Sequence, residues 1–356
     1  MVQVKIHLPA PARDFGSDNR SGVSPSVLAA LAAANIAARS ESYGLDRESM
    51  GTTAAMCELF DQEVHAVLVP SGTAANVAAI GALLDGPGGC VLAAEDAHIR
   101  LDESGAIERA WGVPLVPVAV SAGLLPLDKI SSSIARLRNN APFSPKPMVL
   151  SLTELSETGR RYGAGLLAEL CEIAHFYDIK VHVDGARFAN ALVEDPQLSS
   201  LFDLGVSTLA FGGTKNGQLP VEAIVSVDAQ VHDRVYRAAK QLGYVQSKSR
   251  FVAAGLGESI RSGEFLANAA KANECAQRLS GLLTAGGLAP EYPVDGNLVF
   301  VRVPAHLIEG IDAWCHVSRW DESGLIRLAC SWDHTFEDVD RLAAGLLLAF
   351  QSSESA

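Results

Sequence analysis

Short apolar runs alternate with helical stretches along most of this 356-residue chain, and this alternation limits the fold more than any other feature. Strands separated by helices are typical of a mostly parallel sheet with helices on both faces. The runs expected to form strands are 64–70, 91–93, 115–118, 148–152, 179–184, 208–211 and 223–227. Helices are expected over 73–84 and 166–177, and Ser24-Pro25 indicates the start of an earlier helix that runs to about Arg39.

The pattern changes after about residue 250. A helix is followed by strands at 298–303 and 325–329 and by a helix at 336–350. This order predicts a small α+β C-terminal domain. We therefore expect an α/β protein with a large domain over 1–250 and a small domain over 251–356.

Composition limits the class of protein. The chain carries 41 acidic and 28 basic side chains, a formal charge of −13, which argues against nucleic-acid or anionic membrane partners. No apolar run approaches the ~20 residues of a membrane span, and the N-terminus lacks the apolar core of a signal peptide. The six cysteines are scattered without a CxxC pair, which favours reduced thiols over disulfides or a metal site. A cytoplasmic metabolic enzyme is expected.

Chemically active residues follow several of the expected strands. Asp184 closes the alternating run IKVHVD and is followed three residues later by Arg187. A carboxylate fixed at a strand end is suited to hold the ring nitrogen of pyridoxal phosphate (PLP) protonated, and an arginine fork is suited to bind a carboxylate. An ordinary surface turn explains this pair alone equally well.

Lys215 follows the next apolar strand and two glycines, 31 residues after Asp184. This distance is about one strand–helix–strand unit, so both residues would reach the same edge of the sheet. A sheltered lysine is neutral often enough to form a Schiff base. A loop lysine in isolation is more often solvated, but the strand-end Asp184 favours the functional interpretation.

Two further positions are compatible with the same ligand. Ser71, Gly72 and Thr73 lead from a strand into a helix, where free N–H groups form an anion site suited to a phosphate. Simple N-capping would explain them as well. His98, beyond the strand at 91–93, could lie flat on a pyridine ring or accept a proton, although a lone histidine is more often structural.

The motifs together resemble the threonine aldolase family, within the aspartate-aminotransferase-like (fold type I) PLP enzymes. The resemblance covers nearly the whole chain and is carried above all by HVDGAR (182–187) and TKNG (214–217). Further matching segments are SDNRSG, SYGLD, SGTAAN, AEDAHI, KQLGYVQSKSRF and LIRLACSWD. Within this family the chain resembles the bacterial low-specificity L-threonine aldolases and, as a second candidate, the phenylserine aldolases of similar size and motif set.

The resemblance implies a role for each matching residue. Lys215 would carry PLP, Asp184 would pair with its ring nitrogen and His98 would stack on its ring. Ser71, Gly72 and Thr73 would hold its phosphate. The substrate carboxylate and the cofactor edge would be gripped by Ser17, Arg187 and Arg327. Residues reaching a neighbouring subunit's site would be Tyr43, Lys240 and Lys248.

The implied activity is retro-aldol cleavage of L-β-hydroxy-α-amino acids to glycine and an aldehyde, in a homodimer or dimer of dimers. Many family members have a histidine in the segment equivalent to 153–159, whereas this chain reads TELSETG. The second proton carrier therefore stays open between Glu157, a water and the cofactor phosphate. A β-eliminating lyase or an aminotransferase is the alternative enzyme, and a non-catalytic binding module is the alternative from another class.

Overall fold

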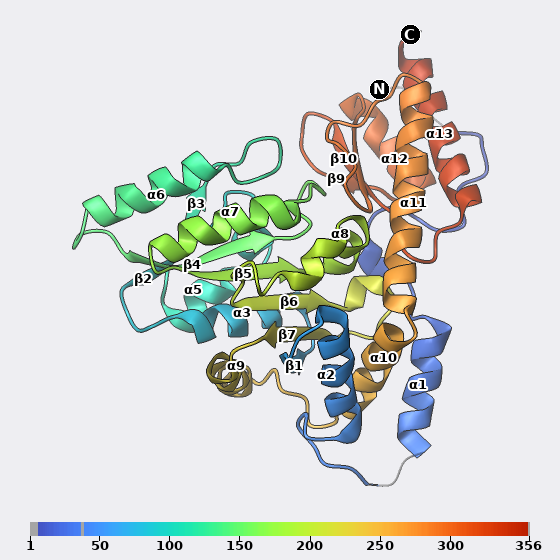
Figure 1. The fold of residues 1–356 in the computed structure, drawn as a ribbon. Helices are drawn as coiled ribbons and strands as arrows, with labels where there is room; N and C mark the ends of the chain where they lie inside the picture. The colour runs from blue at the N-terminus through green and yellow to red at the C-terminus, as the bar shows by residue number, and fades with distance from the viewer. Residues whose placement is uncertain (1–5, 37–38, 355–356) are drawn as a thin grey trace.

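The computed structural model describes residues 6–36 and 39–354, and a seven-stranded sheet forms its centre (Figure 1). The strand order is β1-β7-β6-β5-β4-β2-β3. The bounds are His65–Val69 (β1), Gly89–Ala94 (β2), Leu115–Val118 (β3), Lys146–Thr153 (β4), Lys180–Gly185 (β5), Thr208–Gly212 (β6) and Glu222–Ser226 (β7). All seven runs expected to form strands lie in this sheet.

Five neighbouring strands, β3, β2, β4, β5 and β6, run parallel. The exception is β7, which is antiparallel to both β6 and β1. The expectation of a mostly parallel α/β sheet is confirmed. Because β1, β5 and β6 point the same way, their carboxyl ends meet at one edge.

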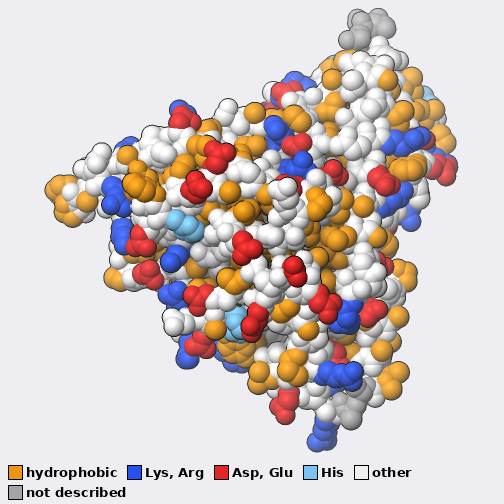
Figure 2. Space-filling model, viewed as in Figure 1, with side chains coloured by type: hydrophobic (Ala, Val, Ile, Leu, Met, Phe, Trp, Pro, Cys, Tyr) orange, Lys and Arg blue, Asp and Glu red, His pale blue; other side chains and the backbone are white. Residues whose placement is uncertain are grey.

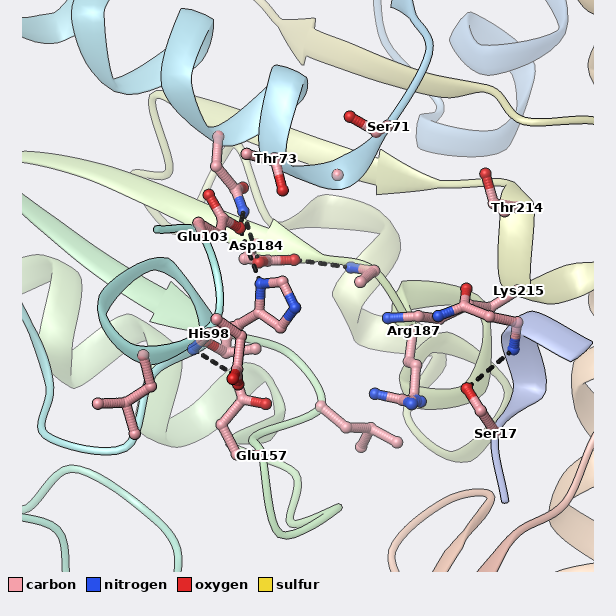
Figure 3. A pocket seen from close by; sticks show the side chains of 18 of the residues that line it. Ser17, Ser71, Thr73, His98, Glu103, Glu157, Asp184, Arg187, Thr214 and Lys215 are labelled. Atoms are coloured by element: carbon pink, nitrogen blue, oxygen red, sulfur yellow. Dashed lines mark hydrogen bonds and ion pairs between the residues drawn. The ribbon is translucent and has the colours of Figure 1, made fainter. Parts of the chain in front are cut away.

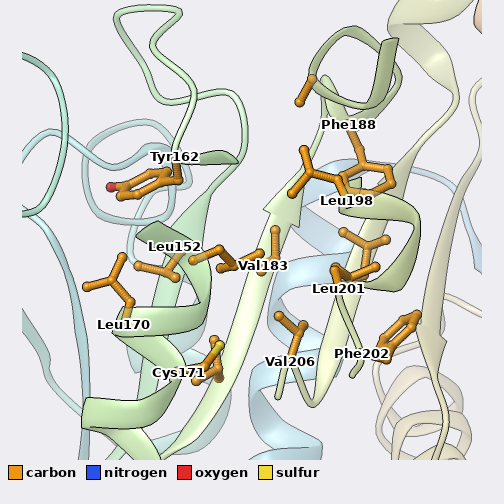
Figure 4. Packing of buried hydrophobic residues seen from close by; sticks show 14 of the residues in the cluster. Leu152, Tyr162, Leu170, Cys171, Val183, Phe188, Leu198, Leu201, Phe202 and Val206 are labelled. Atoms are coloured by element: carbon orange, nitrogen blue, oxygen red, sulfur yellow. The ribbon is translucent and has the colours of Figure 1, made fainter. Parts of the chain in front are cut away.

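Helices cover both faces of the sheet (Figure 1). Successive residues of β2 point to opposite faces, so Cys90 and Leu92 join one apolar cluster while Val91 and Ala93 join the other. Figure 4 shows part of the first cluster, where Leu152 and Val183 of the sheet meet residues from the covering helices. The helices of the large part are Pro25–Ile36 (α1), Arg47–Phe60 (α2), Gly72–Leu83 (α3), His98–Leu101 (α4), Ala106–Trp111 (α5), Leu127–Asn139 (α6), Gly163–Phe176 (α7), Phe188–Glu194 (α8) and Ala229–Gln241 (α9).

Several expected helices differ only at their ends. The helix expected over 73–84 is α3, and that over 166–177 is α7. The helix expected to run from Pro25 to about Arg39 ends at Ile36, and residues 37–38 lie outside the described residues. Ser24 precedes α1 as expected, and its hydroxyl contacts Ser26 and Glu264.

The C-terminal part contains a small antiparallel sheet of order β8-β10-β9. Its elements are Arg250–Arg261 (α10), Glu264–Ala285 (α11), Leu298–Arg302 (β8), Ile308–Trp314 (α12), Ser318–Arg319 (β9), Leu325–Ala329 (β10) and Phe336–Glu354 (α13). The expected strands and last helix are present, whereas β9 was not predicted. The division at residue 250 stays a prediction, since α10 packs on α1 and α2 and the C-terminal apolar cluster includes Phe15.

Acidic and basic side chains are intermixed on the face shown in Figure 2. None of the helices within residues 6–36 and 39–354 combines the length and the apolar character that crossing a bilayer requires. All six cysteines are free thiols, and five of them are buried.

Candidate active site

The carboxyl ends of β1, β5 and β6 open into a cavity of about 770 Å³ (Figure 3). Ligands of mostly parallel sheets bind at such an edge. Most of the residues predicted from the sequence line this cavity. They are Ser17, Ser71, Gly72, Thr73, His98, Asp184, Arg187, Lys215 and Arg327.

The loop after β1 brings a helix N-terminus to the cavity. Ser71 caps the 12-residue α3, and its hydroxyl accepts a hydrogen bond from the N–H of Ala74 at 3.2 Å. The first N–H groups of a helix have no acceptor within the helix, and its dipole favours an anion. Gly72 and Thr73 lie in this first turn, and Thr214 lines the same cavity. This end of the cavity is therefore suited to a phosphate group.

Asp184 lies near the end of β5, and its side chain is held in place by two donors. The N–H of Ala186 donates to its Oδ1 at 3.0 Å, and the amide Nδ2 of Asn76 donates to its Oδ2 at 2.8 Å. The residue is only 4% exposed and lines the cavity. A carboxylate fixed in this way can pair with the protonated nitrogen of an aromatic ring.

His98 begins α4 and lies between two carboxylates (Figure 3). Its Nδ1 is 2.8 Å from Oε1 of the buried Glu103, and its backbone N–H donates to Oε1 of Glu157 at 2.9 Å. The hydrogen bond to Glu103 raises the pKa of His98. Burial raises the pKa of Glu157, and the nearby Asp184 acts in the same direction. With Nδ1 engaged by Glu103, Nε2 is the ring nitrogen that can meet a ligand.

Lys215 lies on a 3-10 turn, Thr214–Asn216, directly after β6. Burial lowers the pKa of its ammonium group, and the positive charge of Arg187 acts in the same direction. A lower pKa increases the fraction of neutral amine, which is the nucleophilic form. The position is therefore suited to covalent attachment of a carbonyl compound.

Arg187 is bound to a residue that was not predicted, Asp18. Its Nε and Nη2 donate to the two Asp18 oxygens at 2.7 and 3.0 Å, and Asn297 donates to Asp18 at 3.0 Å. Burial alone would raise the pKa of Asp18, but the charges of Arg187 and Lys215 lower it to about 2. Two of the three Arg187 nitrogens are therefore committed, and its predicted contact to a substrate carboxylate would use Nη1.

Arg327 of β10 reaches the cavity from the C-terminal part of the chain. Its Nη2 donates to the carbonyl of Gly16 at 3.3 Å, which places it beside Ser17. Its Nε is buried without a hydrogen-bond partner among the described residues, and burial lowers the pKa of this guanidinium. A half-buried guanidinium whose buried Nε has an unused donor is suited to an anionic ligand.

The other three predicted residues, Tyr43, Lys240 and Lys248, lie outside this cavity. The ammonium of Lys240 is 3.7 Å from the centre of the Tyr43 ring, and the Tyr43 N–H donates to the carbonyl of Ser247. Both lysines are exposed. Their predicted contact with a neighbouring subunit's site stays a prediction.

Four residues that organise the site were missed from the sequence. Asp18 and Asn76 contact residues more than 100 positions away in the chain, so no local signal identified them. Glu103 lies five positions after His98, which it contacts, so an acidic residue close to His98 was the signal available for it. Glu222 of β7 lines the cavity and accepts the N–H of Gly213 at 2.8 Å, and burial raises its pKa to about 7. The sequence signal available for Glu222 was a charged residue at the start of an otherwise apolar run.

Comparisons with known proteins agree with this geometry. A family model described as β-eliminating lyase matches residues 14–306. The low-specificity L-threonine aldolase of Pseudomonas aeruginosa is 33% identical, over 94% of this chain and 97% of its own length. The enzyme of the same name from a Pseudomonas species is 31% identical with the same coverage.

Among solved structures, a threonine aldolase from Leishmania major superposes with a TM-score of 0.88 at 22% identity. The match covers 95% of this chain and 99% of that one, so the fold is shared along nearly the whole length. This structural match shows the fold alone, whereas the family model and the sequence identities identify the family. The chain therefore belongs to the β-eliminating lyase family and, within it, to the threonine aldolases.

Proposed function

We propose that this chain is a PLP-dependent aldehyde-lyase that cleaves L-β-hydroxy-α-amino acids to glycine and an aldehyde. Its substrates would be L-threonine, L-allo-threonine and L-phenylserine. The observation that carries the proposal is the meeting of Lys215, Asp184 and the N-terminus of α3 in one cavity. An amine, a fixed carboxylate and an anion site match the aldehyde, the ring nitrogen and the phosphate of PLP.

The residues of the cavity fit this cofactor. Lys215 would attach it, Asp184 would face its ring nitrogen and His98 would lie on its ring. The phosphate would be held by Ser71, Gly72 and Thr73. Bound PLP accepts the electrons that are released when the Cα–Cβ bond of the substrate breaks.

Three residues would orient the substrate through its carboxylate. Arg327 has an unused buried donor and binds the carbonyl of Gly16, the residue before Ser17, and both Arg327 and Ser17 line the cavity. Arg187 would contribute Nη1 while Asp18 holds the rest of its guanidinium. Fixing the carboxylate while the amine is held beside the cofactor decides which bond to Cα stands perpendicular to the ring, so Cα–Cβ cleavage is favoured.

Nε2 of His98 would act as the general base and accept the proton of the substrate β-hydroxyl. Glu103 holds Nδ1 and raises the pKa of this imidazole, in the manner of a carboxylate–histidine pair. Glu157 is the second candidate. It comes from the segment in which many family members carry a histidine, and it contacts the backbone of His98 rather than the ring.

These arrangements give a stereochemical expectation. The carboxylate contacts fix the configuration at Cα, so L-substrates are accepted and D-substrates rejected. Discrimination at Cβ is expected to be weaker, because no second histidine lies among the cavity residues to fix the hydroxyl. Initial rates for L-threonine, L-allo-threonine, L-threo-phenylserine and their D-enantiomers test this. Comparable rates for the D-forms would contradict the carboxylate assignment.

Because the matching family model is described as β-eliminating lyase, β-elimination is the second candidate reaction. Elimination or transamination would yield a keto acid, with ammonia in the case of elimination, whereas aldol cleavage yields an aldehyde and glycine. The presence of Glu157 and His98 on one side of the cavity supports hydroxyl deprotonation. Measuring the aldehyde and the keto acid in the same sample distinguishes the reactions.

We further propose a homo-oligomer, at least a dimer, in the cytoplasm. Tyr43 and Lys240 form an exposed pair outside their own chain's cavity, which supports a role at a neighbouring site. The six free thiols support a reducing compartment. Light scattering of the active enzyme is expected to give a dimer or tetramer, and Lys240→Ala is expected to weaken PLP binding. A fully active monomer would contradict the shared site.

A further inference from the structure

A single amide, that of Asn76 on α3, connects the two residues proposed to contact the PLP ring. Its Nδ2 donates to Oδ2 of Asp184 at 2.8 Å and to Oε1 of Glu103 at 3.0 Å. The same Glu103 oxygen is 2.8 Å from Nδ1 of His98 (Figure 3). Asn76 is completely buried, so both of its amide protons are used on carboxylates.

The orientation of this amide follows from its partners. Ionised carboxylates only accept hydrogen bonds, so the nitrogen of Asn76 faces them and Oδ1 faces the other way. On that side Oδ1 is 3.1 Å from Nε2 of His182, a fully buried side chain on β5. An amide oxygen only accepts, so Nε2 of His182 must carry a proton.

The other ring nitrogen of His182, Nδ1, faces Thr208 on β6. Burial lowers the pKa of His182 to about 4, so the ring is neutral near pH 7 and has one donor and one acceptor nitrogen. With the proton on Nε2, Nδ1 accepts from the Thr208 hydroxyl, 3.0 Å away. The direction of every hydrogen bond from Thr208 to Asp184 is thereby fixed.

We infer that Thr208, His182 and Asn76 are positioning residues that hold the Asp184 carboxylate in the orientation needed to pair with the PLP ring nitrogen. Neither Thr208 nor His182 lines the cavity, so both act through Asn76. If His182 adopted the other tautomer, the Asn76 amide would turn its oxygen toward two carboxylates. Asp184 would then lose a donor, and the proton shared with the ring nitrogen would move toward Asp184.

This inference rests on the proposed function only in that PLP is the cofactor. The matched variants are Thr208→Val, which keeps the shape and removes the hydroxyl, and Thr208→Ser, which keeps the hydroxyl. Each is reconstituted with PLP labelled with ¹⁵N in the ring, and the nitrogen chemical shift is measured by NMR. For Thr208→Val we expect a shift toward the value of neutral pyridine and a fall in kcat of about tenfold, typical for loss of an outer partner of a site ligand. KM should change little, and Thr208→Ser should match the wild type.

If the Thr208→Val variant has the same ring-nitrogen chemical shift and the same kcat as the wild type, the inference is overturned. A second measurement needs no variant: NMR of the wild-type imidazoles should show His182 as the Nε2–H tautomer, and the Nδ1–H tautomer would overturn the inference even if Thr208→Val does not fold. Aldehyde release by the wild type is measured separately. If PLP binds but no aldehyde forms, the proposed function fails while the ring-nitrogen comparison still decides on the positioning residues.

Discussion

The stabilisation that the ionised Asp18 gains from its surroundings, chiefly from Arg187, can be worked out from the structure. Two hydrogen bonds of 2.7 and 3.0 Å join the two residues, and the pKa of Asp18 is about 2 instead of 3.8. A difference of this size corresponds to about 2 kcal/mol of folding free energy at neutral pH. Because the pKa is lower in the folded protein, this stabilisation is complete above pH 3.8 and is lost as the pH falls through about 2.

Asp18→Asn is expected to lower the free energy of unfolding by more than this, by about 3–5 kcal/mol. The reason is that the buried Arg187 then lacks its hydrogen-bonded carboxylate. The matched control is Asp233→Asn, whose partner Arg237 is also an arginine but whose pair is 65–72% exposed, so the expected loss is below about 1 kcal/mol. The assay is urea unfolding of the holoenzyme at pH 7 and fixed PLP concentration. Equal losses for the two variants would refute the reasoning.

Further predictions concern the catalytic groups. Borohydride reduction should link PLP to the peptide containing Lys215, and label on another lysine would refute that assignment. Asp184→Asn should retain some PLP but lose most turnover, whereas near wild-type turnover would exclude Asp184 as the ring-nitrogen partner. The kcat/KM of the wild type should rise with pH through the pKa of His98, which the hydrogen bond to Glu103 raises. Glu103→Gln should therefore move this rise to lower pH, and an unmoved rise would count against His98. Glu157→Gln should retain most activity, because Glu157 contacts the backbone of His98 rather than its ring. A loss of about 10²–10⁴-fold would instead identify Glu157 as the base.

The sheet was predictable from the sequence because its strands are apolar runs bounded by turns and helices. The site residues at strand ends were predictable for the same reason: Asp184 and Lys215 end parallel neighbours, so they meet at one edge. Strand β9 has only two residues, Ser318–Arg319, and so carries no periodic pattern. It forms because β10 offers it hydrogen-bond partners.

The partners of the site residues were not predictable. Asp18 and Arg187 are 169 positions apart, and Asn76 and Asp184 are 108 apart. No local pattern relates such positions, and only the tertiary packing brings them together. Arg187 shows the consequence: its chemistry suggested a carboxylate ligand, and the structure supplies one from the chain itself.

The central claim is tested most directly by the products formed from L-threo-phenylserine. The purified holoenzyme is incubated with this substrate, and benzaldehyde, glycine, ammonia and keto acid are measured in the same samples over time. We predict benzaldehyde and glycine in equal amounts, without keto acid or ammonia, and no product from the Lys215→Ala variant. Ammonia with phenylpyruvate as the main products would contradict aldol cleavage and assign the chain to β-elimination.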